Sequence, residues 1–200
     1  MSNPLAQLHQ EIQQLENKIE RYLESLQETW HYRIDNGKVR FDALIRAAHK
    51  THKVNVVKYL LSARLSHIVS VPFIYGMFFP LLLLDISLLI YQQICFRLYD
   101  IPLVKRGEYF VVDRHLLSYL NAIEKFNCFY CSYGNGLIAF AREVLARTEQ
   151  YWCPIKHAAK VKDSHSRYLQ FSDYGDAENY RHHLESLRKA LNARSKCRPE

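Results

Sequence analysis

The sequence predicts a mainly α-helical, membrane-associated chain, and three observations lead to that prediction. Apolar residues near the N-terminus recur at alternating steps of three and four, which is the spacing of a coiled-coil helix. Residues 65–96 contain only one formally charged side chain, and a Cys/His pattern follows further along. We therefore expect five parts: a coiled-coil helix (1–34), a basic amphipathic helix (35–64), a membrane segment (65–97), a small helical Cys/His domain (98–162) and a tail with a terminal helix (163–200).

The composition permits a folded core and argues against nucleic acid as a partner. Of the 200 residues, 48% are hydrophobic and 24% are charged, so the chain is not globally disordered. The net charge of +7 is spread over the whole chain, whereas a nucleic-acid arm would concentrate it. Basic residues just before the apolar stretch fit anionic lipid headgroups more simply.

The N-terminal helix has a heptad seam. Its members are Leu5, Leu8, Ile12, Leu15, Ile19, Tyr22 and Leu26. Such a seam predicts that residues 5–30 bind a second copy of the chain or a partner helix. The alternative is an amphipathic helix that folds back on its own domain, and we favour self-association. A turn at Asp35-Asn36-Gly37 and a second amphipathic helix over about 41–64 should follow, with His49 and His52 facing headgroups and not a metal.

The membrane segment is predicted from its length. Asp85 alone interrupts the apolar stretch, and a bilayer core needs a helix of roughly 20 apolar residues. A buried helix of a soluble domain seldom runs so long without a polar face. The stretch begins too far from the N-terminus for an export signal. The lipid bilayer is therefore the expected partner.

Two membrane topologies remain open. A single span should show an imbalance of positive charge between its flanks. Residues 45–64 carry five Lys or Arg and residues 97–116 carry four, which is balanced. Pro72, Gly76 and Pro80 could break the helix within the bilayer. We favour a re-entrant helix–break–helix wedge with both ends in the cytoplasm over a single span.

The remaining elements are predicted from caps and turn residues. In chain order they are a short strand at 108–112, a helix from the cap Asp113 to about Asn127, a turn at Gly134-Asn135-Gly136, a helix over 137–152 ended by Pro154, and a terminal helix over 177–194 capped by Asp176.

The residues most suited to chemistry form two pairs. Cys128 and Cys131 form a Cys-x-x-Cys pair, and Cys153 and His157 form a Cys-x-x-x-His pair. If the helix between them returns the chain so that the pairs meet, three thiolates and one imidazole make a tetrahedral site for structural zinc or an iron–sulfur cluster. Glu149 could then support the site from outside. A redox dithiol or disulfide, and plainly structural cysteines, are the alternatives.

Two blocks of sequence carry a resemblance. At NCFYCSYGNG and TEQYWCPIKH, with the preceding VVDRHLLSYLNAIEKFN, the chain resembles an uncharacterised family of proteobacterial membrane-associated proteins. That resemblance implies a bacterial inner-membrane location, with the Cys/His domain in the cytoplasm, and implies no activity. The Cys-x-x-x-His ending is also similar to that of NEET-type iron–sulfur proteins, whose first two cysteines are separated by one residue where this chain has two.

Three functions follow as expectations. The first is a membrane-anchored module with a Cys128/Cys131/Cys153/His157 metal site. The second is a membrane adaptor or scaffold that works through coiled-coil contacts without metal chemistry. The third is a membrane-bound redox or electron-transfer protein. No nucleophile–base pair, phosphate loop or pair of acids supports an enzyme, so whether the chain is an enzyme stays open.

Overall fold

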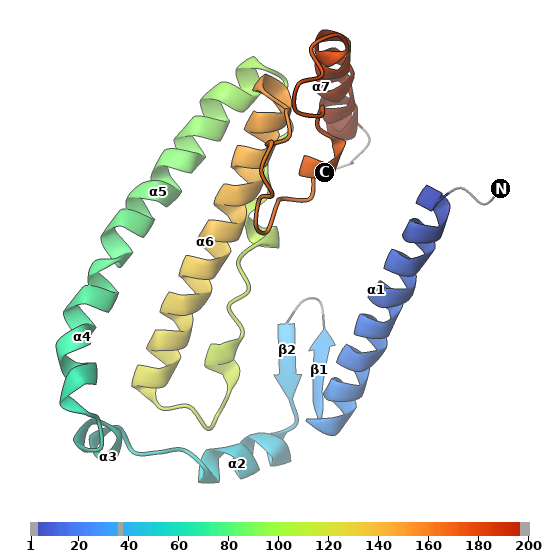
Figure 1. The fold of residues 1–200 in the computed structure, drawn as a ribbon. Helices are drawn as coiled ribbons and strands as arrows, with labels where there is room; N and C mark the ends of the chain where they lie inside the picture. Colours follow the sequence, from blue (N-terminus) through green and yellow to red (C-terminus); the bar gives the residue numbers. More distant parts are fainter. Residues whose placement is uncertain (1–3, 36–37, 197–200) are drawn as a thin grey trace. The chain divides into compact units, whose positions relative to one another are not determined.

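The computed structural model describes residues 4–35 and 38–196 and is mainly helical, as predicted (Figure 1). The chain separates into two compact units. The first unit comprises Met1–Ser62 and Asp113–Phe126, and the second comprises Ala63–Val112 and Asn127–Glu200. Cys197 and two residues of the predicted Asp35-Asn36-Gly37 turn lie outside the described residues.

The first unit begins with a long helix and a hairpin. Helix α1 (Pro4–Thr29) confirms the predicted N-terminal helix. Strands β1 (Tyr32–Asp35) and β2 (Lys38–Phe41) pair antiparallel, with Tyr32 opposite Phe41. The single helix predicted over 41–64 is wrong, because two short helices, α2 (Ala43–Thr51) and α3 (Val56–Leu61), stand in its place. Asn55 separates them, since its side chain accepts a hydrogen bond from the Val57 backbone at 2.9 Å and starts a new helix.

Aromatic side chains hold the hairpin against α2. The His49 ring lies edge-on to Phe41 at 5.5 Å and to Tyr119 at 5.6 Å between ring centroids. Phe41 in turn contacts Tyr32 across the strands at 5.9 Å. His49 is therefore a packing residue of this unit, and the prediction that it faces lipid headgroups is wrong.

In the second unit the apolar stretch is helical throughout. Helix α4 (Leu65–Gly76) and helix α5 (Phe78–Tyr91) are separated only by Met77, and a π-helical turn follows at Gln92–Phe96. Pro72 lies inside α4 and does not end it. Among the described residues, this 32-residue stretch is the one helical segment long and apolar enough to cross a membrane.

Helix α6 (Ala122–Trp152) packs along α4 and α5 in the same direction (Figure 1). Three contacts along the two partners give that direction. Near the start, Tyr130 Oη donates to the Ile74 carbonyl at 2.6 Å, and the Tyr133 and Phe78 ring centroids are 5.6 Å apart. Near the end, the Thr148 and Tyr91 hydroxyls are 3.0 Å apart. Residue numbers rise together on both sides, so the chain does not reverse between α4 and α5. The predicted wedge, which needs such a reversal, is wrong.

Helix α6 is one continuous helix where the sequence predicted two, over 113–127 and 137–152. Asn121 and Glu124 cap it reciprocally, with backbone-to-side-chain hydrogen bonds of 3.0 and 2.8 Å. The predicted turn at 134–136 is wrong, because this segment lies inside α6. Gly136 allows the crossover to approach α6 closely. A Cβ at this position would lie 2.9 Å from the Tyr109 carbonyl oxygen and 3.1 Å from the Phe110 ring.

The predicted strand at 108–112 is also wrong, and the helix predicted over 113–127 begins only at Ala122, as the start of α6. Short 3₁₀ turns stand at Arg106–Glu108 and Arg114–Leu116, and apart from the helical residues Arg97 and Leu98 the rest of the segment from 97 to 121 is irregular. This segment is the crossover that a parallel helix pair requires, since it returns the chain from the end of α5 to the start of α6. The end of α6 at Trp152, before Pro154, agrees with the prediction.

The core of the second unit lies at the C-terminal half of the helix pair. Helix α7 (Tyr180–Lys196) agrees with the predicted terminal helix and buries Leu184, Leu187 and Leu191. The cluster of buried side chains around Leu191 comprises Leu88, Phe96, Ile101, Val104, Leu137, Phe140, Ala141 and Val144. Helix α4, by contrast, has no buried residue.

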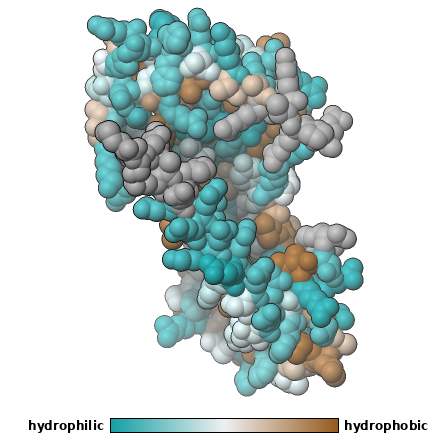
Figure 2. Space-filling view, turned by 90° about the vertical axis from the view of Figure 1, so that its right-hand side faces the viewer, coloured by the Kyte–Doolittle hydropathy of each residue, from teal (hydrophilic) through white to brown (hydrophobic). Residues whose placement is uncertain are grey.

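The face drawn in Figure 2 is mainly hydrophilic, with hydrophobic residues only in small groups.

Candidate membrane-facing surface and the predicted cysteine site

One face of the α4–α5 helix is apolar and exposed. Only 11% of the residues in its most apolar window are buried. Exposed apolar side chains recur at helical spacing along this face, which we call the outer stripe: Leu65, Val69, Phe73, Phe79, Leu83, Ile86, Ile90 and Ile94. Phe73 is 75% exposed and Phe79 is 74% exposed, which is unusual for phenylalanine in water. A contiguous apolar patch of this kind marks an interaction surface.

The opposite face of the same helix carries its one carboxylate. Asp85 is 5% exposed and accepts two hydrogen bonds from Arg106, at 2.7 and 3.2 Å. Tyr133 on α6 donates a third, at 3.1 Å. The Arg106 guanidinium also lies 3.8 Å from the centroid of the Phe110 ring. The hydrogen bond with Asp85 raises the pKa of Arg106, so the cation is held firmly.

The Asp85 cluster therefore belongs to the interior of the protein and not to the outer stripe. Its arginine comes from the crossover segment and its tyrosine from α6, so it ties both to α5. A bidentate pair of this kind satisfies a charge that would otherwise be costly to bury. The carboxylate that appeared to interrupt a membrane segment in the sequence is thus turned away from the exposed face.

The crossover limits how the outer stripe can meet a bilayer. Residues 97–121 carry seven charged side chains: Arg97, Asp100, Lys105, Arg106, Glu108, Asp113 and Arg114. If the α4–α5 helix crossed a bilayer with α6 beside it, this irregular, charged segment would have to cross back. Irregular backbone exposed to lipid leaves polar groups unsatisfied and does not occur in the hydrocarbon region. A straight span by the α4–α5 helix, with α6 beside it, would therefore place the crossover in lipid.

The structure does not bring the four predicted metal ligands together. Cys128 and Cys131 lie on the N-terminal half of α6, and Cys153 follows its last residue. At the rise of an α-helix, Cys131 and Cys153 are about 33 Å apart. The prediction required the chain to turn back between the pairs, whereas α6 is continuous. Within residues 4–35 and 38–196, no group of three His, Cys, Asp or Glu side chains is arranged to hold a metal ion.

The predicted ligands have other surroundings. The described cysteines are not in disulfides, and Cys131 and Cys153 are exposed. Partial burial, together with the negative charge of Glu149, raises the pKa of the Cys153 thiol, which opposes the thiolate form. The His157 ring stacks on Tyr168 at 6.2 Å, and its backbone N–H donates to the Tyr168 hydroxyl at 2.7 Å. Glu149 pairs with His165 at 2.9 Å.

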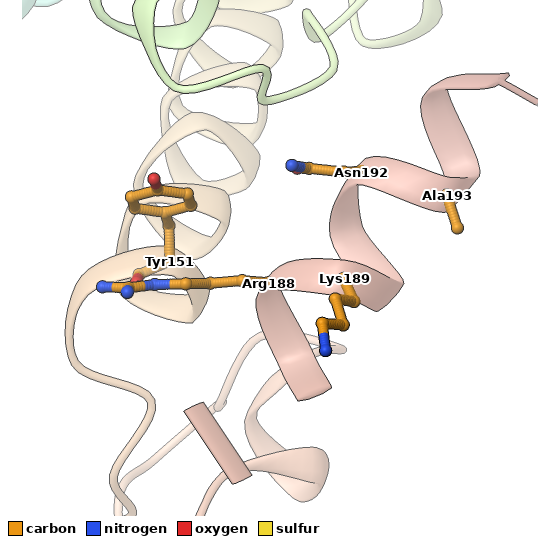
Figure 3. Close-up of a pocket in the computed structure, with 5 residues that line it drawn as sticks. All are labelled: Tyr151, Arg188, Lys189, Asn192 and Ala193. Carbon is orange, nitrogen blue, oxygen red and sulfur yellow. The ribbon is translucent and has the colours of Figure 1, made fainter. Parts of the chain in front are cut away.

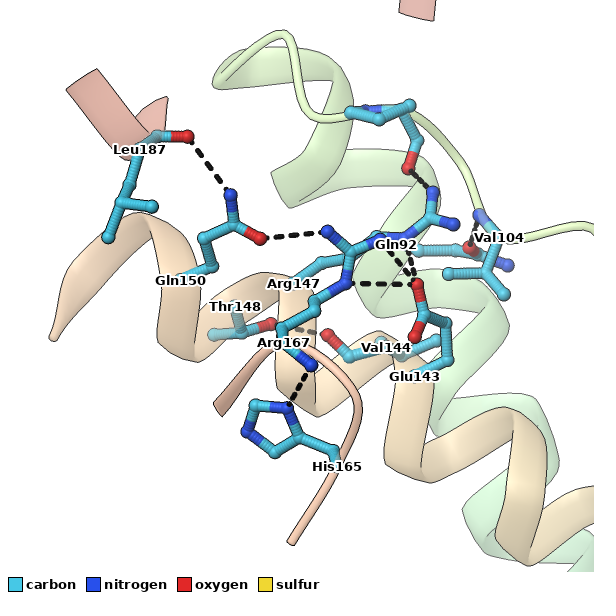
Figure 4. Close-up of polar contacts among 11 residues, drawn as sticks. Gln92, Val104, Glu143, Val144, Arg147, Thr148, Gln150, His165, Arg167 and Leu187 are labelled. Carbon is cyan, nitrogen blue, oxygen red and sulfur yellow. Dashed lines mark hydrogen bonds and ion pairs between the residues drawn. The ribbon is translucent and has the colours of Figure 1, made fainter. Parts of the chain in front are cut away.

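A polar network on α6 was missed by sequence reasoning (Figure 4). Glu143 accepts hydrogen bonds from Arg147 at 2.8 Å and from Arg167 at 2.7 and 3.2 Å. Arg167 also donates to the Gln150 side chain at 2.8 Å. The Gln150 amide in turn donates to the Leu187 carbonyl at 3.0 Å. The network thus joins α6 to the loop after it and to α7.

Glu143 is largely buried, not the surface partner that its i,i+4 spacing with Arg147 indicates. Burial alone would raise the pKa of Glu143, but the hydrogen bonds from Arg167 and Arg147 outweigh it and lower that pKa. Arg147 also donates to the Pro102 carbonyl of the crossover. No sequence signal marks Arg167 as a partner, because it lies 24 residues away in an irregular loop.

A small pocket lies between the end of α6 and α7 (Figure 3). Its lining comprises Tyr151, Arg188, Lys189, Asn192 and Ala193, and its volume is about 360 Å³. Arg188 is already engaged, since its guanidinium lies 4.6 Å from the Tyr151 ring centroid and its Nε donates to the Tyr151 carbonyl at 2.8 Å. We assign Arg188 to packing between the two helices.

Comparisons with known proteins found no match for the chain. No protein-family model matches the chain, and neither does any curated protein or solved structure. The resemblance to a proteobacterial membrane-associated family therefore stays an expectation from the sequence.

Proposed function

We propose that this chain is a membrane adaptor whose α4–α5 helix lies in the plane of the bilayer interface and holds a helical domain at the membrane surface. The observation that supports the proposal most directly is the outer stripe, an exposed apolar face on a helix whose α5 part packs its other face on α6. An exposed apolar face of this kind could lie about 5–10 Å deep at the bilayer interface, as the apolar face of an amphipathic helix does.

Two further features support an in-plane position. The helix is 32 residues long, about 48 Å at the α-helical rise, and therefore exceeds the roughly 30 Å hydrocarbon core that a straight span would need to cross. Arg64 and Arg97 flank the stretch at its two ends, where cations can pair with anionic headgroups. Both termini of the chain would then lie on the same side of the bilayer, as the balanced basic flanks also favour.

Flotation with lipid vesicles tests the membrane contact. We expect the chain to float with vesicles that contain anionic lipid, and the double variant Phe73→Glu/Leu83→Glu to stay at the bottom of the gradient. Both side chains are exposed, at 75% and 66%, so their replacement should leave the fold intact. The matched control is Leu169→Glu/Tyr174→Glu, which also adds two carboxylates, at sites 79% and 70% exposed outside the stripe. Equal flotation of the double variant and the control would refute the proposal.

Reporter fusions at the two chain ends test the in-plane position separately. Reporters that are active only in the cytoplasm should be active at both ends of the full chain. Opposite compartments for the two ends would establish a span, and would mean that α6 separates from the α4–α5 helix in the membrane.

A further inference from the structure

Helix α1 carries a second unpartnered apolar face, distinct from the outer stripe. Ile12, Leu15, Ile19 and Tyr22 form its seam and are 52%, 58%, 59% and 63% exposed. The sequence continues the same heptad to Leu5 and Leu8. A 26-residue helix with a seam of this regularity matches the pattern by which two helices pair. We propose that α1 pairs with α1 of a second copy of this chain, and that the two helices run antiparallel.

The charges beside the seam decide the direction. In heptad terms, Ile12 and Ile19 occupy position a, and Leu15 and Tyr22 occupy position d. Position g then holds Glu11 and Lys18, while position e holds Glu16 and Leu23. Residues at e and g flank the apolar seam and set the orientation of the partner.

A parallel pair places like charges together. In that arrangement a g residue faces the e residue five positions later on the second helix. Glu11 would face Glu16 of the second copy, and symmetry repeats this repulsion on the other side. Lys18 would face Leu23, which offers no compensating charge. Like charges at such positions destabilise a helix pair.

An antiparallel pair places opposite charges together. When Ile12 packs against Leu15 of the second copy, position g faces position g. Glu11 then faces Lys18 of the second copy, and symmetry supplies the same attraction again. At the described centre of the seam, Ile12 of each copy packs against Leu15 of the other, so the seam is apolar on both sides there.

The charges also select this register over its neighbours. A shift by one heptad in one direction brings Lys18 against Lys18 of the second copy, and also Glu16 against Glu16. A shift in the other direction brings Glu11 against Glu11. Only the register that pairs Ile12 with Leu15 joins opposite charges at position g. The resulting dimer carries two outer stripes, and linked binding sites raise overall attachment through effective concentration.

Charge reversal in the full chain, in detergent at low salt, tests the inference. Sedimentation equilibrium with density-matched detergent measures the dimer dissociation constant. Glu11→Lys should weaken the dimer about tenfold, because two attractive pairs become repulsive. Lys18→Glu should weaken it similarly, and the double variant should restore the wild-type constant within about threefold. The matched control is Glu24→Lys, which makes the same charge change at the outermost heptad position and should have little effect.

Three results would overturn the inference. A parallel pair predicts that Glu11→Lys tightens the dimer, because it replaces two Glu–Glu contacts with Lys–Glu contacts. If the double variant does not recover the wild-type dissociation constant, the proposed register is rejected. A wild-type chain that stays monomeric at every concentration would reject self-association. Circular dichroism confirms that each variant keeps its helical content. Because the assay uses no lipid, its result is independent of the proposed membrane contact.

Discussion

Arg106 of the crossover donates two hydrogen bonds to Asp85 of helix α5, at 2.7 and 3.2 Å. The Asp85 side chain is 7% exposed, whereas the Arg106 side chain is 39% exposed. The carboxylate therefore depends on its partner more than the guanidinium does, because the guanidinium can still reach water. Replacing Arg106 should therefore lower the free energy of unfolding more than replacing Asp85 does.

We expect Arg106→Gln to lower the free energy of unfolding by about 3 kcal/mol, because it leaves a buried carboxylate without a cation. Asp85→Asn should cost less, about 1 kcal/mol, since the arginine that remains is partly solvated. The double variant Asp85→Leu/Arg106→Met should recover much of the loss, because it removes both charges. Denaturant unfolding in mild detergent measures all three. Arg142→Gln, which breaks an ion pair with the exposed Asp163, is the control and should cost less than about 1 kcal/mol.

Acid should weaken the second unit through Glu143. Its pKa is lowered in the folded state, so it binds a proton more readily in the unfolded chain. Its stabilising contribution is therefore complete above the ordinary carboxyl pKa and is lost as the pH falls through the lowered value. We expect the melting temperature of the wild type to decrease when the pH is lowered past about 4.5. The Glu143→Gln variant should have a lower melting temperature at neutral pH and lose less of it in acid. Parallel pH profiles for the two proteins would contradict this assignment.

The two glycines at the middle of α6 should respond oppositely to alanine. Gly136→Ala should destabilise the protein by about 2 kcal/mol, because the new Cβ would lie 2.9 Å from the Tyr109 carbonyl oxygen. Gly134→Ala should stabilise it by about 0.5–1 kcal/mol through helix propensity, since its Cβ would meet only the Leu81 side chain at 3.6 Å. Thermal unfolding of both variants checks the pair. Equal effects of the two variants on the melting temperature would contradict the close approach assigned to Gly136.

The cysteines should act independently of one another. Because Cys131 and Cys153 lie about 33 Å apart along α6, one ion cannot join them. We expect Cys131→Ser and Cys153→Ser each to change the melting temperature no more than Cys95→Ser does. A chelator should leave all of these temperatures unchanged. Stoichiometric zinc or iron in the purified chain, lost from both Cys131→Ser and Cys153→Ser, would instead restore the shared site that the spacing predicted.

Several elements could be predicted from the sequence because local signals specify them. Helix α1, the terminal helix α7 and the end of α6 before Pro154 each depend on residues a few positions apart. The Asn55 and Asn121 caps were available as signals and were missed. The structure keeps the two predicted ligand pairs apart for a different reason. The predicted site depended on a turn at Gly134-Asn135-Gly136, and glycine serves a close helix approach as well as it serves a turn.

What the sequence determined by itself is a long apolar helix over residues 65–96, because length and lack of charge are local properties. Which of its faces is covered was decided only by the tertiary structure. Side chains on both faces are apolar, so no periodicity separates the face that packs on α6 from the outer stripe. The direction of α6 likewise depends on contacts such as Tyr130 with Ile74, 56 residues apart. That direction places a charged crossover beside the helix, and it is the physical reason for proposing a helix in the membrane plane where the sequence alone left a span open.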